Sequence, residues 1–334
     1  MFSFYIKMSN RLSIVWQKKK CDSHALDRFR FGREFTIPSL TAMSNQFQLP
    51  FISTKEQILR EALAEWDISK RTLTAIKFEG GSLLVNGQEK TVRHILQKGD
   101  MVTVIFPPEK VSDGLLLQAG ELDIVYEDDV LLVVNKPAGL VTIPSKEHPT
   151  GSLANIIAYY YDQQQISSTV HILTRLDRDT SGLICLVKNR HIHHVMTSNH
   201  LLEKTYEAFV EGNVALDHQS IIAPIGRKGT SIIEREVQEG GQYAHTDVTV
   251  LRRFERFTHV SSLLHTGRTH QIRVHLAHIK HPLVGDELYG GSVKDLTRSA
   301  LHCSSLTIKH PLTKEVMKLK APLPKDMSEF LALQ

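Results

Sequence analysis

Short apolar runs separated by charged turns dominate the chain from about residue 121 onward. Runs with strand-like character occupy residues 124–126, 130–134, 183–187, 205–211, 245–254, 258–264, 300–309 and 316–320. Apolar positions at helical spacing occur in fewer places, namely residues 152–161, 191–200 and 270–278. Strands that outnumber helices in this way are typical of a largely antiparallel sheet with peripheral helices. The pattern therefore predicts an α+β fold for residues 121–334, built on a mixed, largely antiparallel sheet.

A smaller unit with its own pattern precedes this domain, over residues 51–108. Its first helix is indicated by apolar residues at helical spacing, namely Ile58, Leu59, Ala62, Leu63 and Trp66. Ser53 and Glu56 have the spacing of a capping box in front of that helix. Ser69 is placed to cap a second helix over residues 69–77. The unit is therefore expected to begin with two short helices.

Two strand-like stretches complete this unit, at residues 83–87 and 99–106, and Pro107-Pro108 ends the second one. Residues 109–120 carry only a weak pattern and are expected to form a linker. The second helix displays three basic side chains, namely Lys70, Arg71 and Lys77. On charge alone, these suit either a phosphate backbone or a solvated helix face.

The first 50 residues show no sustained period and are predicted to be a disordered extension. Residues 1–42 carry eight basic and three acidic residues, so they account for the whole of the net charge of +4. An argument for an anionic partner therefore has to rest on local basic patches in the remaining chain. The stretch lacks the continuous apolar region and the cleavage site of a signal peptide. A natural start at Met43 is the alternative interpretation.

The composition is that of an ordinary globular protein, with 41% hydrophobic and 23% charged residues. No apolar run approaches the roughly 18 to 20 residues that a membrane helix needs. The three cysteines, Cys21, Cys185 and Cys303, are too far apart for a paired metal site and do not form a disulfide framework. We therefore expect a protein of the reducing cytoplasm without a membrane partner.

The segment LTRLDRDTSGLICLVKN, residues 173–189, sets charged residues directly against a buried strand. Charges at the edge of such a strand cost desolvation energy unless they are paired, and loops at strand ends often hold catalytic groups. Asp177 between Arg175 and Arg178 is expected to stay ionised, which suits a nucleophile or an electrostatic stabiliser. A structural ion-pair cluster is the alternative, and the charge pattern alone favours it.

A second dense segment, residues 263–291, holds the strongest local basic run of the chain. Its basic and imidazole side chains are Arg268, His270, Arg273, His275, His278, Lys280 and His281. Histidines three or four residues apart can ligate zinc, but the segment has no HExxH order and no carboxylate within its predicted helix. We therefore expect no metal site, and we interpret these histidines as facing RNA or packed in the core.

Several motifs in a fixed order resemble those of the RluA-type family of pseudouridine synthases. They are RLDRDTSG, TGRTHQIRVH, HPLVGD and LYGG, supported by LLVVNKPAGL and KTYEAFVEG, and they cover residues 121–324. Within residues 53–108, SKRTLTAIKFEGGSLLVNGQEK and LQKGDMVTV are similar to an S4 RNA-binding domain. The Arg-Leu-Asp opening common in S4 domains is replaced here by Ile58-Leu59-Arg60. The resemblance implies an isomerase that converts uridine in RNA to pseudouridine.

The resemblance also implies roles for individual residues. Asp177 matches the essential aspartate, the nucleophile that attacks the sugar or the base of the target uridine. Tyr206 matches the tyrosine that stacks on the flipped base, and Arg273 matches the arginine that pairs with the aspartate. Arg175 matches the arginine that fills the stack when the uridine leaves it. The residue before it is often His in the family and is Thr174 here, a difference expected to alter contacts to the RNA strand.

The residues expected to bind RNA are Arg175, Arg178, Arg268, His270, Lys70, Arg71 and Lys77. No cofactor is expected, because the isomerisation involves no net redox change and the chain has no GxGxxG or Walker loop. Large-subunit ribosomal RNA is the expected substrate, with transfer RNA second, and no obligate protein partner is implied. A non-catalytic RNA-binding protein of the same fold and a metal-dependent hydrolase built on the histidines are the alternatives. The intact set of Asp177, Tyr206 and Arg273 argues against the first of these.

Overall fold

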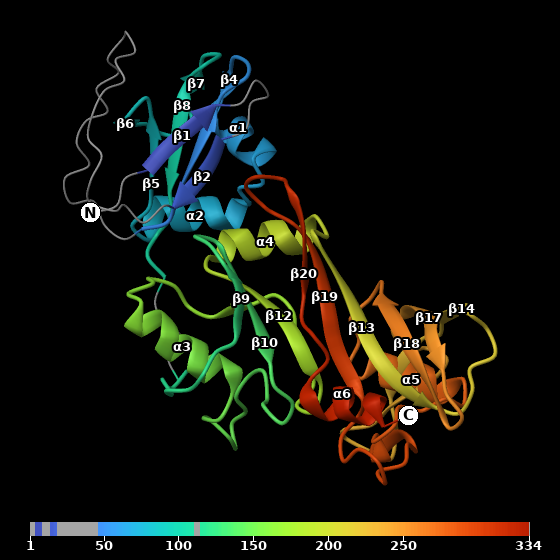
Figure 1. Cartoon of the computed structure of the whole chain (residues 1–334). Helices are drawn as coiled ribbons and strands as arrows, with labels where there is room; N and C mark the ends of the chain where they lie inside the picture. Colours follow the sequence, from blue (N-terminus) through green and yellow to red (C-terminus); the bar gives the residue numbers. More distant parts are fainter. Residues whose placement is uncertain (1–3, 9–13, 19–45, 110–113, 334) are drawn as a thin grey trace.

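The computed structural model describes residues 4–8, 14–18, 46–109 and 114–333. These residues form a small N-terminal module and a larger sheet domain (Figure 1). Within the predicted disordered extension, β1 (Phe4–Met8) and β2 (Ile14–Lys18) are strands that pair with each other in antiparallel fashion. The rest of that extension, up to residue 45, lies outside the described residues, as does Met43.

The small module combines a four-stranded antiparallel sheet with two helices. The sheet order is β3-β8-β5-β6, with bounds β3 (Gln48–Ile52), β5 (Ser82–Val85), β6 (Gln88–Glu89) and β8 (Met101–Ile105). The helices are α1 (Leu59–Glu65) and α2 (Lys70–Phe78). Buried residues of both helices share one core with the sheet, among them Leu63, Ile76 and Val104. The module therefore has a hydrophobic core of its own.

The start of this module differs from the prediction. It begins with β3 at Gln48 rather than at residue 51, because Leu49 is buried and pairs with Val104 of β8. Pro50 lies within this strand. It is accommodated because β3 is an edge strand, which is where a sheet tolerates proline.

One of the two predicted helix caps is present. Ser69 accepts a hydrogen bond from the Thr72 backbone N–H (3.1 Å) and caps α2, as predicted. The capping box at Ser53 is wrong: its hydroxyl donates to the Lys55 carbonyl instead (2.8 Å). The chain then forms β4 (Gln57–Ile58), which pairs with β7 (Ile95–Leu96), and α1 begins at Leu59 without a side-chain cap.

Contacts at the end of the small module fix it on the sheet domain. The Phe106 ring stacks on His191 with ring centroids 5.0 Å apart. Glu109 accepts a hydrogen bond from the Arg190 backbone N–H (2.7 Å) and pairs with His171. The first residue of the predicted linker is therefore held by both α4 (Arg190–Ser198) and β11 (His171–Ile172).

The larger domain is built on one ten-stranded sheet. Its order is β14-β17-β18-β13-β19-β12-β10-β9, with β11 also paired to β12 and β20 to β19. The bounds are β9 (Ile124–Glu127), β10 (Leu131–Lys136), β12 (Ser181–Val187), β13 (Leu202–Glu211), β14 (His218–Ile222), β17 (His245–Arg253), β18 (Phe257–Leu264), β19 (Leu301–Lys309) and β20 (Val316–Lys320). Among the described strands, β12 and β19 form the one parallel pair. The predicted α+β class with a mixed, largely antiparallel sheet is confirmed.

Helices lie around this sheet (Figure 1), and the strand register places two of them on opposite faces of it. The α5 helix (Gln271–His278) packs on the face where Thr246 of β17 is buried, and His275 bonds the Thr246 hydroxyl (2.9 Å). The α6 helix (Lys325–Ala332) places Phe330 against Phe209 of β13, on the other face. The remaining elements are α3 (Leu153–Gln163), η1 (Glu287–Tyr289) and the hairpin of β15 (Ile225–Arg227) and β16 (Arg235–Val237). No helix in the described part of the chain is long and apolar enough to cross a membrane.

Candidate active site

The loop between β11 and β12 carries Asp177, and its backbone is fixed by contacts from distant parts of the chain. The Thr142 hydroxyl donates to the Leu176 carbonyl (2.7 Å), and the Gly139 N–H donates to the Arg178 carbonyl (2.9 Å). The residues on both sides of Asp177 are therefore anchored to the loop that follows β10. A fixed backbone holds a catalytic side chain in one position without further loss of entropy.

Lys136, at the end of β10, reinforces this anchor from inside the protein. Its buried ammonium group donates to the carbonyls of Pro137, Leu140 and Arg178 at 2.8 to 3.0 Å. Burial lowers the pKa of Lys136 to about 8, although the carboxylate of Asp179 opposes this shift. One buried cation thus joins the KPAG segment to the loop that carries the aspartate.

Gly182 is required where β12 begins. Its φ is +113°, and a Cβ atom there would lie 2.4 Å from the Cys303 carbonyl oxygen on β19. The same stretch pairs Ser181 with His302, whose side chains are also hydrogen-bonded (2.9 Å). Because no side chain fits, glycine allows β12 and β19 to run side by side immediately after the loop.

Two groups of α5 and its N-terminal turn surround the Asp177 carboxylate. Arg273 Nη1 lies 3.7 Å from Asp177 Oδ2, and His270 Nε2 lies 3.9 Å from the same oxygen. About a third of the Asp177 side chain (34%) remains exposed. The predicted pairing of Asp177 with Arg273 is present as a loose contact, and the carboxylate remains partly open to solvent.

Arg273 is held in place by a second carboxylate. Its Nε and Nη2 donate to the two oxygens of Asp286 at 2.6 and 2.7 Å, and the Asp286 side chain is 1% exposed. The Arg273 guanidinium also lies over the Tyr289 ring, 4.9 Å from its centroid. Burial opposes the charged form, but the hydrogen bonds and charge of Asp286 raise the pKa of Arg273. Only Nη1 is directed at Asp177.

His270 occupies a left-handed backbone position (φ 57°) immediately before α5. Its Nδ1 is 2.8 Å from the Tyr289 hydroxyl, and that hydroxyl accepts a hydrogen bond from the Arg235 backbone N–H (3.0 Å). Burial lowers the pKa of His270, with the charge of Asp177 acting in the opposite direction. The imidazole is therefore a neutral, oriented neighbour of Asp177 at physiological pH.

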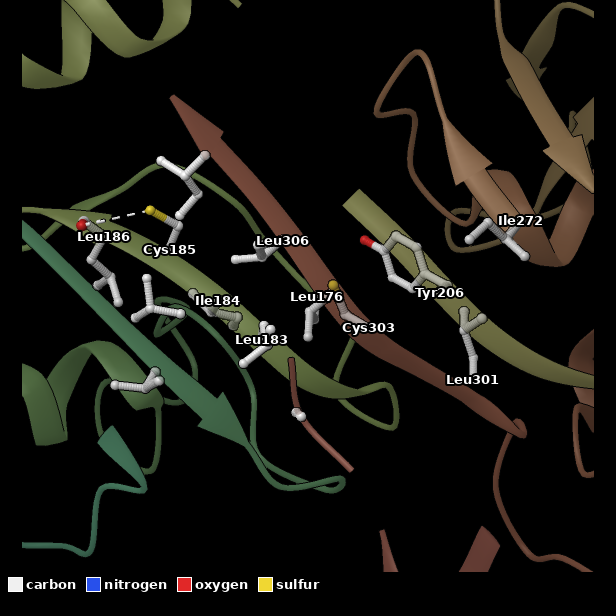
Figure 2. Packing of buried hydrophobic residues seen from close by; sticks show 14 of the residues in the cluster. Leu176, Leu183, Ile184, Cys185, Leu186, Tyr206, Ile272, Leu301, Cys303 and Leu306 are labelled. Carbon is white, nitrogen blue, oxygen red and sulfur yellow. Dashed lines mark hydrogen bonds between the residues drawn. The ribbon is translucent and has the colours of Figure 1, made fainter. Parts of the chain in front are cut away.

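Tyr206 lies on β13 in the core beside this site, and only 4% of it is exposed. Figure 2 shows its hydroxyl turned toward β19, the strand that carries Cys303. Burial raises the pKa of Tyr206 well above its ordinary value, and the Cys303 thiol and the Asp177 charge add to this shift. The structure thus brings Tyr206 to the region of Asp177, as a protonated phenol covered by other side chains.

The predicted RNA-binding residues near this site lie at its rim. Arg175 is exposed, and Arg178 is exposed and pairs with Asp179 (3.1 Å) rather than with Asp177. Arg268 Nε donates to the Tyr243 carbonyl (2.9 Å), which fixes one side of its guanidinium. The interpretation that Arg175 and Arg178 flank the aspartate as ion-pair partners is thus corrected, because Arg273 has that position.

The remaining predicted RNA-binding residues are not brought to Asp177. Lys70, Arg71 and Lys77 are exposed on α2 of the small module. Figure 1 shows α2 at the opposite end of the molecule from α5. If these cations contact RNA, they contact a part of it that is distant from the reacting nucleotide.

Thr174 has a structural role. It is buried, and its hydroxyl accepts a hydrogen bond from the Cys185 backbone N–H (2.9 Å). The Thr174 hydroxyl is engaged in this buried hydrogen bond and is not exposed to a bound RNA. The expected difference in RNA contacts from family members with His at this position stays a prediction.

Lys204 was not predicted as a site residue, although it is part of the KTYEAFVEG motif. It lies two residues before Tyr206 on β13 and therefore on the same face of the sheet. It is partly buried, and its Nζ is near Gly267 of the loop that leads to α5. Among the described residues, no carboxylate or hydrogen-bond acceptor is within bonding distance of this ammonium group, which leaves it available to an anion.

Sequence reasoning also missed Asp286 and Tyr289. Their signal was present in HPLVGD and LYGG, which were recognised as motifs without a role for single residues. Lys136 gave a similar signal in LLVVNKPAGL. These residues act through Arg273, His270 and the loop backbone, so their importance becomes visible only when the contacts are known.

Comparison with known proteins agrees with this arrangement. The sequence profile of the family described as RNA pseudouridylate synthase matches residues 130–278. An RNA pseudouridine synthase of Bacillus subtilis named YjbO, itself uncharacterized, is 47% identical over 82% of this chain and 98% of its own length. The ribosomal large subunit pseudouridine synthase D of Pseudomonas aeruginosa is 35% identical over 86% of this chain and 94% of its own length.

Solved structures agree with these sequence matches. Human RNA pseudouridylate synthase domain containing 1 covers 62% of this chain and 86% of its own, with a TM-score of 0.50 and 26% identity. Human RNA pseudouridylate synthase domain containing 4 shares the fold, with a TM-score of 0.51 and 20% identity over 63% of this chain and 91% of its own. The fold, the ordered motifs and the near full-length relatives together show that this chain belongs to the RluA-type family of RNA pseudouridine synthases, which are isomerases.

Proposed function

We propose that Asp177 is the nucleophile of this RNA pseudouridine synthase. The observation that carries the proposal is a one-third exposed carboxylate, 3.7 Å from an arginine whose other donors are locked on Asp286. Carboxylates are ionised at neutral pH, and an oriented guanidinium stabilises negative charge as it forms or moves nearby. Arg273 would therefore position the nucleophile and stabilise its charge without neutralising it by a tight ion pair.

The reaction conserves all atoms of the nucleotide. The bond between N1 of uracil and C1′ of ribose breaks, the base turns, and a bond between C5 and C1′ forms. A proton leaves C5 and N1 gains one. The Asp177 carboxylate attacks the sugar or the base and is released again at the end. A base inside a folded RNA must first be extruded from its stack.

Tyr206 and Lys204 are proposed to meet the extruded nucleotide. Because only 4% of Tyr206 is exposed, a base that stacks on it has to displace the groups that cover the ring. Lys204 holds an ammonium group on the same face without a protein acceptor among the described residues, which suits a backbone phosphate. Arg175 and Arg268 at the rim are proposed to contact the strand around the flipped base.

Large-subunit ribosomal RNA is the substrate that we propose. The support is a relative of 35% identity whose name gives it that role and of which this chain covers 94%. We further propose that the small module is an S4-like RNA-binding domain. Its exposed Lys70, Arg71 and Lys77 on α2 are suited to contact phosphates, which makes binding weaker as the salt concentration rises.

The experiment compares Asp177→Asn with Asp179→Asn, a matched change two residues further along the same loop. RNA carrying tritium at C5 of uridine releases the label when pseudouridine forms. We expect Asp177→Asn to lower this release by at least about 1000-fold, as is typical when a nucleophile is removed. Asp179→Asn should stay within about tenfold of the wild type, because its partner Arg178 lies at the surface.

Substrate RNAs test the two levels of the proposal separately. We expect the wild-type protein to release tritium from transcripts of large-subunit ribosomal RNA. Tritium release from transfer RNA alone would overturn the ribosomal assignment but not the proposed chemistry. Wild-type rates in Asp177→Asn would overturn the nucleophile. Circular dichroism of both variants checks that they are folded.

A further inference from the structure

We propose that His245, Asp247 and His265 form a binding site for a divalent transition-metal ion. His245 Nε2 lies 3.1 Å from Asp247 Oδ1, and His265 Nε2 lies 2.6 Å from Asp247 Oδ2. Among the described residues, these three form the one group whose possible ligand atoms converge to within 4.8 Å of one another. The two imidazole rings are stacked with centroids 4.1 Å apart, and both Nε2 atoms lie against the carboxylate of Asp247.

The site is separate from the catalytic centre. His245 and Asp247 are two residues apart on β17 and share one face of the sheet. Thr246 between them is buried on the other face, where it bonds His275 of α5. Because α5 also carries Arg273, the metal site and Asp177 are on different sides of β17. The ion would therefore have a structural role.

The ligand atoms are nearly in place. Zinc lies about 2.0 to 2.2 Å from nitrogen and oxygen ligands, so tetrahedral ligands are roughly 3.3 Å apart. The observed 2.6 and 3.1 Å are hydrogen-bond distances, and an ion that replaces the shared protons has to widen them by less than about 1 Å. The side chains are 21%, 22% and 41% exposed, which leaves room for water as a further ligand.

Neighbouring hydrogen-bond donors orient the Asp247 carboxylate as a possible metal ligand. The Ser220 hydroxyl on β14 donates to Asp247 Oδ1 (2.5 Å). This bond, followed by those from His265 and His245, lowers the pKa of Asp247 to about 2. A metal-binding carboxylate is often oriented by such an outer hydrogen bond. The carboxylate is therefore oriented before any ion binds.

The ligand types indicate which ions fit. Two imidazoles select zinc and related first-row ions over calcium and magnesium, which prefer oxygen ligands. Three protein ligands with an open position are an arrangement that zinc accepts.

An ion at this place would brace the segment that leads to the active site. His265 directly follows β18 and precedes Thr266. The Thr266 hydroxyl accepts from the His245 N–H (3.0 Å) and donates to Gln271 Oε1 (2.8 Å) at the start of α5. The ion would thus cross-link β17 to the polypeptide that carries His270 and Arg273.

Calorimetric titration of the full chain with zinc tests the proposal, after treatment with EDTA and dialysis at pH 7.5. We expect one site with Kd of about 10 μM or tighter, a visible absorption band when cobalt is used instead, and a melting temperature raised by zinc. His265→Gln and Asp247→Asn should remove this site from the isotherm and abolish the cobalt band. His218→Gln is the matched control, because His218 is an exposed histidine on neighbouring β14 that bonds Thr249 instead.

Two results would overturn the proposal. One is binding weaker than about 100 μM in the wild type, and the other is an unchanged zinc isotherm in His265→Gln. If Asp247→Asn does not fold, His265→Gln decides alone, since its side chain is 41% exposed and tolerates substitution.

Discussion

Replacing Gly182 by Ala tests how the loop with Asp177 is joined to the sheet. Gly182 pairs with Cys303 across the parallel contact of β12 and β19. A new Cβ atom would lie 2.4 Å from the Cys303 carbonyl oxygen and 2.5 Å from its nitrogen. Both obstacles are backbone atoms, so no side-chain rotation relieves the clash. The strands have to separate locally.

The expected loss of stability has two parts. A non-glycine residue at positive φ costs roughly 1–2 kcal/mol. Relief of the clash needs a backbone shift of about 0.6 Å or more, since contacts under 3.0 Å essentially never occur. The β12–β19 contact spans two residue pairs, and weakening about two hydrogen bonds costs a further ~2 kcal/mol. We therefore expect Gly182→Ala to lower the free energy of unfolding by about 3–4 kcal/mol.

Gly139→Ala is the matched control. Gly139 also has a positive φ (+85°), but nothing lies within 4 Å of its new Cβ atom, so only the first part of about 1–2 kcal/mol applies. Urea unfolding followed by far-UV circular dichroism measures both variants. Trp66 packs against the core of the small module, so its fluorescence shows separately whether that module stays folded. If Gly182→Ala is no less stable than Gly139→Ala, the argument from the Cys303 contact is refuted.

Two further predictions concern buried charge. Asp286→Asn breaks the buried pair with Arg273, so it should lower the free energy of unfolding in urea by about 3–5 kcal/mol and reduce tritium release. The matched change at the exposed Asp295, Asp295→Asn, should cost less than ~1 kcal/mol. Equal losses in the two variants would contradict the buried-pair argument. Burial lowers the pKa of His191 to about 4, so the unfolded chain takes up a proton from about pH 6.5 downward before the folded one does. Stability should fall by roughly 2–3 kcal/mol between pH 7 and 4.5, and His191→Phe should lack this part of the pH dependence.

Local patterns in the sequence predicted much of the fold. Most strands of the large sheet lie within a few residues of their predicted ranges, and β20 matches its range of 316–320. The predictions for short segments were wrong where local signals conflicted with long-range strand pairing. The strand β3 was not predicted, and Ser53 resembled a helix cap although Gln57 and Ile58 pair with β7. In each case, contacts across the module outweighed the local preference.

The candidate site shows the same division. Asp177, Arg273 and His270 were predicted, and the fold brings Arg273 and His270 within 4 Å of Asp177. Their supporting residues were missed because the supporting contacts are made between distant segments. Arg298, for example, donates to the Asp179 carbonyl (3.1 Å) across 119 positions of the chain. The cluster of His245, Asp247 and His265 likewise follows no spacing rule, since β17 and the end of β18 create it.

By itself, the sequence determined the class of fold, the order of the motifs and the placement of a carboxylate before a buried strand. These follow from apolar periodicity and from side-chain chemistry, which are properties of neighbouring residues. Only the tertiary structure decided that β12 lies beside β19, that Arg273 is locked on Asp286, and that two histidines share Asp247. These features depend on strand register and on buried ion pairs between segments that are far apart in the sequence. Their interaction energies exist only once the chain is folded.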